Sequence, residues 1–391
     1  MLLRLFASFF KIGLFTFGGG WAMIAVIERE IVDNHRWISK TEFLDLLAVA
    51  QAMPGILAVN ISSVVGDRLR GLRGGVAAAL GTMLPSFLII LAIAVWLTPE
   101  VIKNNVYVSS IFRGIRPAVV ALIVAPVITT ARSAGITWRT AVIPLAVALL
   151  IVSRLPVISN PIVFVVLGAS VGYVRWKRGQ ERQVPPASGA ATAAAPITIP
   201  LGPVGAGAAT YLKLIWAYLK IGLFGFGGGY AMLSLIQREV VEPGWITTQQ
   251  FTDIVAISQM TPGPIGINSA TYIGYVVTGS VWGSLAATLA VVLPPFVLTM
   301  MASRYIDRHR SSGTIQGILA GLRPVVVGLI ASAALLLMNS ENFGYTMHDS
   351  LVSVAICIAT FCCVFFTRIH PIAAIIAAGI IGLLIGVFPC V

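Results

Sequence analysis

Two arginines lie deep inside apolar stretches of the chain. Arg116 and Arg323 each fall about eight or nine residues from the start of the stretch, and a proline follows each of them. At about 1.5 Å per helical residue, this depth is one where a charge normally faces a bundle interior or water. Because proline is favoured in the first turn of a helix, we predict that a new helix begins at each Arg–Pro pair.

A buried guanidinium beside a helix N-terminus suits one class of ligand. Arginine donates bidentate hydrogen bonds to oxyanions, and the amides of a helix N-terminus add a positive dipole. We therefore predict that Arg116 and Arg323 contact a tetrahedral oxyanion. The alternative is a structural pair with a carboxylate or with backbone carbonyl groups.

Two glycine triplets interrupt other apolar stretches. Three glycines weaken a helix by about 2–3 kcal/mol relative to alanine, and irregular backbone is tolerated at membrane depth only where it lines a cavity or is buried in protein. Discontinuous helices whose amides bind an anion and close helix packing through small residues both fit this pattern. The triplets are Gly18-Gly19-Gly20 and Gly227-Gly228-Gly229.

Proline and glycine also fall at the centre of two further apolar stretches, with polar side chains around them. We predict a re-entrant hairpin at each, because proline removes a hydrogen-bond donor and glycine permits a sharp bend. The polar side chains either line a substrate cavity or bond helix to helix. The candidate residues are Gln51, Pro54, Gly55 and Asn60 in the first stretch and Gln259, Thr261, Pro262, Gly263 and Asn268 in the second.

Four carboxylates recur at equivalent positions, Glu30 with Glu239 and Asp45 with Asp253. They are candidates for proton uptake. All four lie near the ends of apolar stretches, and an arginine directly precedes each glutamate. A solvated or ion-paired role is therefore the main alternative.

These residues occur in pairs because the chain contains one unit twice. Residues 11–23 read KIGLFTFGGGWAM and residues 220–232 read KIGLFGFGGGYAM, which gives 11 of 13 identical positions at an offset of 209. We predict a first repeat at residues 1–175, a flexible cytoplasmic linker at 176–210 rich in proline, glycine and alanine, and a second repeat at 211–391. Because the apolar N-terminus recurs inside the chain, we expect it to belong to the mature fold rather than to a signal peptide.

The composition is that of a membrane protein. Hydrophobic residues make up 58% of the 391 residues and charged residues 10%, against about 25% charged in soluble domains. The net charge of +12 comes from cations spread between apolar stretches, which is typical of cytoplasmic loops and argues against binding of nucleic acid. The four cysteines and four histidines lack metal-site spacing, so we expect no metal and no cofactor.

Loop charge orients the two repeats. Residues 66–74 carry three arginines and the equivalent residues 274–282 carry none, whereas residues 303–313 carry three arginines and residues 98–106 a single lysine. Because cytoplasmic loops collect lysine and arginine, the repeats are expected to be inverted. Each repeat has six apolar stretches, so inversion requires one of them to turn back. We predict an all-α polytopic membrane protein with about ten transmembrane helices plus two re-entrant hairpins.

Taken together, these motifs resemble the chromate ion transporter family in its two-domain, fused form. The resemblance rests on the doubled Phe-Gly-Gly-Gly, the Gln-x-Met/Thr-Pro-Gly of the hairpins, the Leu-Pro after the third stretch and the Arg-Pro of the fourth. It implies a multi-pass protein of the bacterial plasma membrane that exports chromate by antiport, driven by the proton gradient, and so confers chromate resistance. Some members of the family are thought to handle sulfate, the isosteric dianion.

The predicted function is therefore secondary transport of chromate, at a site where the hairpins and Arg–Pro pairs meet. A sulfate uptake permease is the nearer alternative, and a membrane-embedded enzyme is the distant one. The sequence carries no Walker A motif and no recognisable nucleophile with its base, so we expect a transporter and not an enzyme. The expected partners are chromate or sulfate and the lipid bilayer, with a homodimer possible and no nucleic acid.

Overall fold

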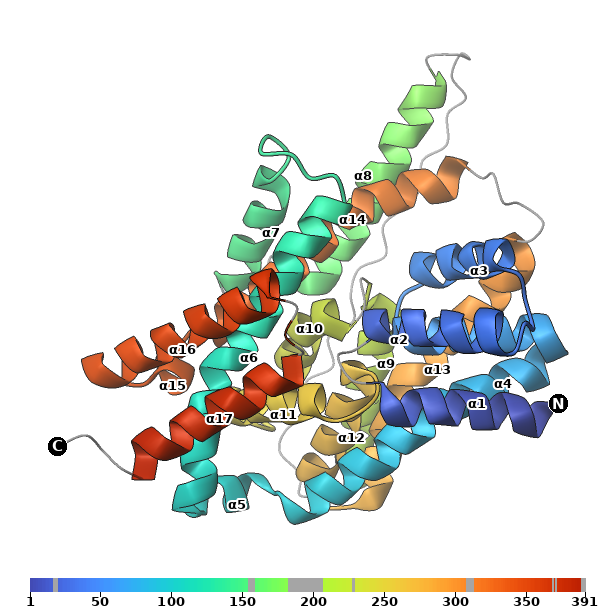
Figure 1. Ribbon diagram of the computed structural model, residues 1–391. Coiled ribbons are helices and arrows are strands. Elements are labelled where there is room, and N and C mark those ends of the chain that lie inside the picture. Colours follow the sequence, from blue (N-terminus) through green and yellow to red (C-terminus); the bar gives the residue numbers. More distant parts are fainter. Residues whose placement is uncertain are drawn as a thin grey trace.

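A computed structural model describes residues 1–16, 20–153, 159–181, 207–226, 229–306, 313–367, 369 and 371–387. Helices form all the regular secondary structure of these residues (Figure 1). The predicted linker lies largely outside them, as do Gly18, Gly19, Gly227 and Gly228. Within the described part, five helices are long and apolar enough to cross a membrane, namely Leu57–Trp96, Val106–Arg132, Val281–Ser303, Ala320–Leu337 and Met347–Phe366. The prediction of an all-α polytopic membrane protein is confirmed.

The two repeats follow a similar order of elements, although α4 of the first corresponds to α12 and α13 of the second and the short helices α5 and α15 fall at different places. The first contains α1 (Leu2–Phe15), α2 (Gly20–Glu28), the π-helical turn η1 (Arg29–Asn34), α3 (Lys40–Ala52), α4 (Leu57–Trp96), α5 (Pro99–Asn104), α6 (Val106–Ser133), α7 (Val142–Val152) and α8 (Pro161–Glu181). The second contains α9 (Ala208–Phe224), α10 (Gly229–Val241), α11 (Thr248–Met260), α12 (Ile265–Thr278), α13 (Val281–Ile306), α14 (Gly313–Leu337), α15 (Ser340–Phe343), α16 (Met347–Phe366) and α17 (Pro371–Val387).

The hairpins begin and turn where the sequence predicts. Ser39 caps α3 by accepting a hydrogen bond from the Glu42 amide, and Thr247 caps α11 in the same way through Gln250. The two helices end at Ala52 and Met260, one residue short of the Pro-Gly pair. Gly55 (φ +96°) and Gly263 (φ +101°) then adopt left-handed backbone conformations that glycine tolerates best.

The segment 66–74, expected to be a loop, is instead a sharp reversal inside α4. Arg70 and Gly71 (φ +62°) leave helical geometry there. The two arms of α4 then pack so closely that a Cβ added to Gly66 would lie 2.6 Å from the Gly74 carbonyl carbon. In the second repeat Gly279 makes the equivalent turn between α12 and α13. Glycine at the contact allows the second hairpin arm to fold back on the next helix.

The predicted helix starts at the Arg–Pro pairs are wrong. Pro117 lies inside α6 and Pro324 inside α14, and both helices continue through them. A proline removes one backbone donor, and a membrane helix tolerates this loss when neighbouring helices and local adjustments satisfy the freed carbonyl.

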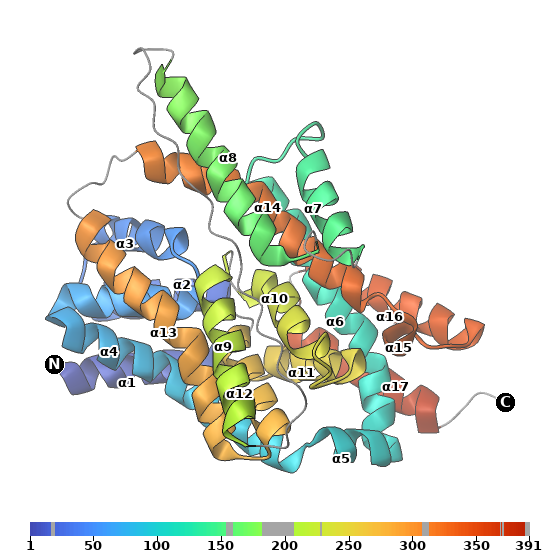
Figure 2. The ribbon, with the colours of Figure 1, turned by 180° about the vertical axis from the view of Figure 1, so that it is seen from behind.

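Equivalent helices of the two repeats pack through equivalent glycines. A Cβ added to Gly114 on α6 would lie 2.8 Å from the Gly382 Cα on α17, and one added to Gly321 on α14 would lie 2.7 Å from the Gly172 Cα on α8. The helices α1 to α4 and α13 lie on one side of the molecule and α6, α7, α8, α14, α16 and α17 on the other, with α9 to α12 between them (Figures 1 and 2). The hairpin of the second repeat therefore occupies the centre.

Candidate functional site

The tip of each hairpin binds the other repeat. The Gly55 amide donates a hydrogen bond of 2.8 Å to the Gly225 carbonyl, and the Gly263 amide donates one of 2.9 Å to the Thr16 carbonyl. Thr16 and Gly225 are equivalent residues, each at the end of the first helix of its repeat. The two contacts are therefore reciprocal, and each hairpin is positioned by the interrupted helix of the opposite repeat.

Three helix N-termini gather around these tips. A Cβ added to Gly266, on the first turn of α12, would lie 3.3 Å from the side chain of Ile56, the residue before α4. A Cβ added to Gly229, the first residue of α10, would lie 3.4 Å from the Cβ of Ile265 at the start of α12. Neither α4 nor α12 has a side-chain cap at its N-terminus. Because the amide end of a helix carries a partial positive charge, this junction favours an anion.

The asparagines of the hairpins brace the backbone. Asn60 Nδ2 donates to the Pro54 carbonyl at 2.9 Å, and Asn268 Nδ2 donates to the Ser258 and Pro262 carbonyls at 3.0 and 3.3 Å. Both side chains are fully buried. Their remaining atom, Oδ1, is an acceptor and cannot bind an oxyanion, so this geometry favours the helix-to-helix role. The hydroxyl of Thr261 likewise donates to the Ile257 carbonyl of its own helix.

The two hairpin glutamines differ. Gln259 is buried, and among the described residues neither polar atom of its amide has a hydrogen-bond partner. Gln51, at the equivalent position of the first repeat, is exposed. An unpaired buried amide costs about 1–3 kcal/mol, which makes Gln259 a donor that a substrate or water can use.

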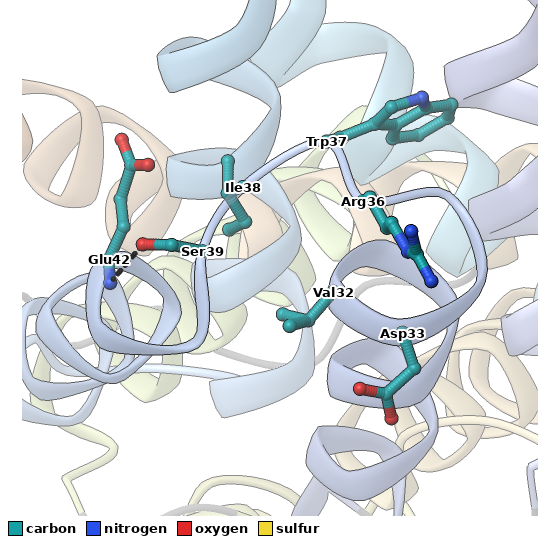
Figure 3. Close-up of a pocket in the computed structure, with 7 residues that line it drawn as sticks. All are labelled: Val32, Asp33, Arg36, Trp37, Ile38, Ser39 and Glu42. Atoms are coloured by element: carbon teal, nitrogen blue, oxygen red, sulfur yellow. Dashed lines mark hydrogen bonds between the residues drawn. The ribbon is translucent and has the colours of Figure 1, made fainter.

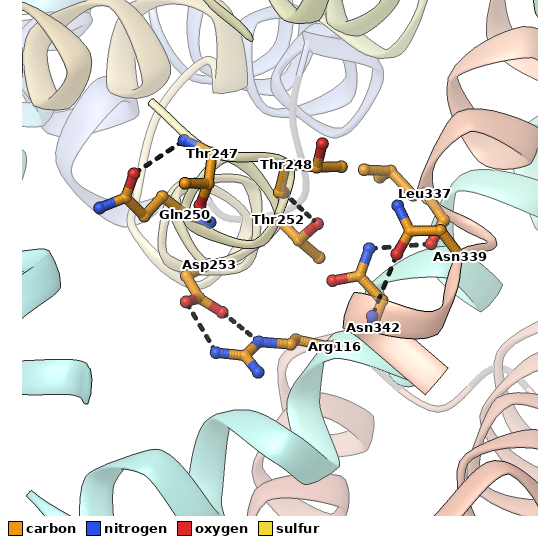
Figure 4. Close-up of polar contacts among 9 residues, drawn as sticks. All are labelled: Arg116, Thr247, Thr248, Gln250, Thr252, Asp253, Leu337, Asn339 and Asn342. Carbon is orange, nitrogen blue, oxygen red and sulfur yellow. Dashed lines mark hydrogen bonds and ion pairs between the residues drawn. The ribbon is translucent and has the colours of Figure 1, made fainter. Parts of the chain in front are cut away.

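Arg116 is buried in a two-point ion pair with the hairpin of the other repeat. Its Nε lies 2.7 Å from Asp253 Oδ1 and its Nη2 lies 3.0 Å from Asp253 Oδ2 (Figure 4). Arg116 is 7% exposed and Asp253 is 4% exposed. When the Gln249 amide is turned so that its oxygen faces the guanidinium, that oxygen accepts from Nη2 at 2.7 Å and also from Nη1. The structure thus shows the carboxylate pairing that the sequence left as the alternative.

The equivalent residues Arg323 and Asp45 are both exposed. Gly321 of α14 packs against α8. Arg323 follows it by two residues, which is about 200° around a helix of 3.6 residues per turn, so Arg323 projects from the face of α14 opposite to α8. The hairpin helix α11 packs against α6, whereas α3 packs against α4 and α13. The equivalent pairs α6–α17 and α14–α8 both join one repeat to the other, but the two hairpins meet the opposite repeat at different helices.

The two glutamates form ion pairs with residues that the sequence reading overlooked. Glu239 binds Lys220 at 2.5 Å, and Glu30 lies 3.9 Å from Lys11. The adjacent arginines are not the partners, because consecutive residues point about 100° apart on a helix; Arg238 pairs with Glu242 instead. The identical lysine that opens both copies of the KIGLF segment was the available signal.

An open hollow of about 650 Å³ lies beside the connection from η1 to α3 (Figure 3). Its polar lining consists of the exposed residues Asp33, Arg36 and Ser39 and the half-buried Glu42. Ser39 is engaged as the α3 cap, and Glu42 forms an ion pair with Arg68. The hollow lies away from the hairpin tips, so we do not assign the oxyanion to it. In the described part of the chain, no three His, Cys, Asp or Glu side chains gather as metal ligands.

Comparison with known proteins identifies the family. Matches to the family described as chromate transporter cover residues 3–173 and 212–383, one for each repeat. The chain belongs to the chromate transporter family. It is 33% identical to a chromate transport protein of Pseudomonas aeruginosa over 99% of this chain and 92% of the relative. No solved structure gave a significant match.

Other relatives in the chromate transporter family differ in length. A chromate transport protein of Cupriavidus metallidurans is 27% identical over 98% of this chain and 92% of its own. An uncharacterized transporter of Bacillus subtilis, YwrA, is 30% identical over 44% of this chain and 94% of its own length. That relative matches less than half of the present chain. With its apolar helices, this family member is a multi-pass integral protein of the bacterial plasma membrane and not an enzyme.

Proposed function

We propose that this protein is a secondary transporter that exports chromate across the plasma membrane, coupled to proton movement, and so confers chromate resistance. The observation that carries the proposal is the ion pair of Arg116 with Asp253, because it places a buried guanidinium at a hairpin of the opposite repeat. The names of the relatives in Pseudomonas aeruginosa and Cupriavidus metallidurans support chromate as the substrate.

Asp253 occupies the face of Arg116 that an oxyanion would use. A carboxylate and a tetrahedral dianion both accept two parallel hydrogen bonds from a guanidinium, so they compete for Nε and Nη2. Once the anion takes these donors, the carboxylate is left buried without its partner, and burial of an unpaired charge is costly. Proton uptake by Asp253 removes that cost. Chromate binding and protonation of Asp253 therefore favour each other.

This linkage bears on the direction of coupling. A proton that binds together with chromate leaves with it, whereas the antiport expected from the family resemblance has the proton enter. Chromate with one proton still carries one net negative charge. An inside-negative membrane potential favours its outward movement by about 2.3 kcal/mol for each charge moved across 100 mV. The ion pair thus favours export with the proton, powered by the potential.

Alternating access would exchange equivalent ion pairs. If the repeats are inverted, a rocking motion that separates Arg116 from Asp253 brings Arg323 toward Asp45. The reciprocal hairpin tips at Gly55 and Gly263 would stay near the axis of this motion. Together with Arg116 and Arg323, the amides at the starts of α2 and α10 (Gly20 and Gly229) are the proposed substrate contacts.

The proposal is tested with the purified protein in liposomes. Chromate flux is measured under an imposed potential and, separately, an imposed pH gradient, with sulfate as competitor. We expect chromate to move toward the positive side and to carry protons with it. Acidification of the compartment that chromate leaves would indicate antiport. Flux of sulfate but not of chromate would indicate the sulfate permease. An absence of flux under all conditions would refute transport by this chain.

The inverted arrangement is tested by labelling the two glycine turns. Gly71 and Gly279 are equivalent turn residues, and a Cβ added at either would meet no atom within 4 Å. Gly71→Cys should react only with reagents that reach the cytoplasm and Gly279→Cys with reagents applied outside. Labelling of both from the same side would show parallel repeats.

A further inference from the structure

A second cavity lies on the surface of the bundle, on helices other than those that form the hairpins. It has a volume of about 460 Å³ and is formed by α7, α8 and α14, which lie side by side in both views (Figures 1 and 2). This volume is within the range of about 300–1,000 Å³ typical of ligand pockets. We call it the α7–α8–α14 groove.

The groove is apolar along most of its length and cationic at one end. Its lining on α8 runs from Phe164 to Trp176, which spans roughly 18 Å at 1.5 Å per residue. Leu167 and Val171 form an exposed apolar wall, and Arg175 and Trp176 close the far end. A long apolar slot that ends in a cation and an indole matches an acyl chain attached to an anionic headgroup, since tryptophan and arginine both favour the membrane interface.

Charge at this end selects the headgroup. Residues 175–181 contain three cations, Arg175, Lys177 and Arg178, and a single carboxylate, Glu181. All three cations are exposed. Clusters of basic residues next to a membrane helix attract anionic lipids, so charge complementarity favours an acidic phospholipid over a zwitterionic one.

The second repeat lacks these features. At the equivalent positions, Ile385 and Gly386 replace Arg175 and Trp176. There α17 closes directly on α6, and a Cβ added to Gly386 would lie 2.5 Å from the Ser110 Cβ. The cation and the indole are therefore particular to the first repeat. The base of the Trp176 side chain packs against Gly317 of α14, whereas the exposed Arg175 indicates a role other than helix packing.

We propose that the α7–α8–α14 groove binds one anionic phospholipid, with an acyl chain along α8 and the phosphate paired with Arg175. Gly321 and Pro324 of α14 form part of its lining and flank Arg323 in sequence. A bound lipid therefore contacts α14, the helix that carries Arg323, for which the described residues show no counterpart of the Arg116 ion pair.

The test compares lipid binding to the full-length protein in detergent. Native mass spectrometry with added phosphatidylglycerol or phosphatidylcholine should show one tightly held phosphatidylglycerol. Arg175→Ala should weaken its binding roughly tenfold, the loss expected for a charge-assisted hydrogen bond. Arg113→Ala is the matched control, because Arg113 is an exposed arginine of α6 that does not line the groove. Leu167→Trp, which fills the slot, should reduce binding without changing charge.

Three results would overturn the proposal. Binding by Arg175→Ala equal to wild type would show that the phosphate is held elsewhere. Equal retention of the two lipids would show that the groove does not select an anionic headgroup. Cross-linking of two protein copies through Leu167→Cys, with no lipid retained, would show that a second copy covers the groove.

Discussion

Arg116 of the first repeat and Asp253 of the second are 137 residues apart in sequence and meet in a buried two-point ion pair, with Nε 2.7 Å from Oδ1. Neither charge is neutralised from within its own repeat by an ion pair in the described part of the chain. The electrostatic balance of the interior therefore depends on how the two repeats are placed relative to each other. The first three predictions concern this relationship.

Removal of one partner should destabilise the protein more than removal of both. Arg116→Ala leaves the Asp253 carboxylate buried without a cation, which costs about 3–5 kcal/mol in comparable buried pairs. The double variant Arg116→Leu with Asp253→Leu should recover most of this stability but no chromate transport. Thermal unfolding in detergent and flux in liposomes measure the two effects.

Arg113→Ala is the control for that experiment. Arg113 lies one turn earlier on α6 and is exposed, so its loss should change neither unfolding nor flux strongly. Chromate flux retained by the double variant would remove Arg116 from the substrate pathway.

Neutralising Asp253 should uncouple anion binding from protons. In the proposed mechanism, chromate binding and protonation of Asp253 favour each other, so the affinity of the wild type should rise as the pH falls, by at most tenfold per pH unit for one linked proton (about 1.4 kcal/mol). Asp253→Asn has no carboxylate to protonate and should bind with nearly constant affinity. Binding of sulfate as competitor is measured across pH, with Glu242→Gln, an exposed carboxylate of α10's C-terminal end, as the control. Unchanged pH dependence in Asp253→Asn would place the coupling proton on another group.

The two equivalent ion pairs should not form at the same time. Arg116→Cys with Asp253→Cys should cross-link in the state shown here, and Asp45→Cys with Arg323→Cys should cross-link only after the repeats have rocked to the opposite state. In a protein that carries all four cysteines, each molecule should therefore form one product or the other. A single molecule that carries both cross-links at once would contradict the exchange.

The hairpin tip should tolerate no side chain. Gly55 has a positive φ, and an added Cβ would run into Pro295 of the opposite repeat, so Gly55→Ala should strongly reduce the yield of folded protein. Gly71 also has a positive φ (+62°, with ψ −159°) but faces open space, so Gly71→Ala should cost only the backbone strain, about 1–3 kcal/mol. Size-exclusion profiles after heating compare the two. Equal stability of the two variants would show that the close approach of Pro295 does not exclude a side chain at position 55.

The sequence by itself determined the features that depend on local chemistry. Proline and glycine at positions 54 and 55 predicted the break between α3 and α4, and the repeated segment predicted an equivalent break between α11 and α12. Local rules failed at Pro117, because continuation of a helix through proline depends on the surrounding helices.

Only the tertiary structure decided which charges meet. The two repeats carry the same arginine and the same aspartate, so a sequence pattern treats Arg116 and Arg323 as equal. A single conformation of the folded chain breaks that equality: it packs α11 on α6 and places α3 against α13. Arg116 then finds a carboxylate while Arg323 remains exposed, because long-range pairing is a property of how the repeats are arranged rather than of the residues in either one.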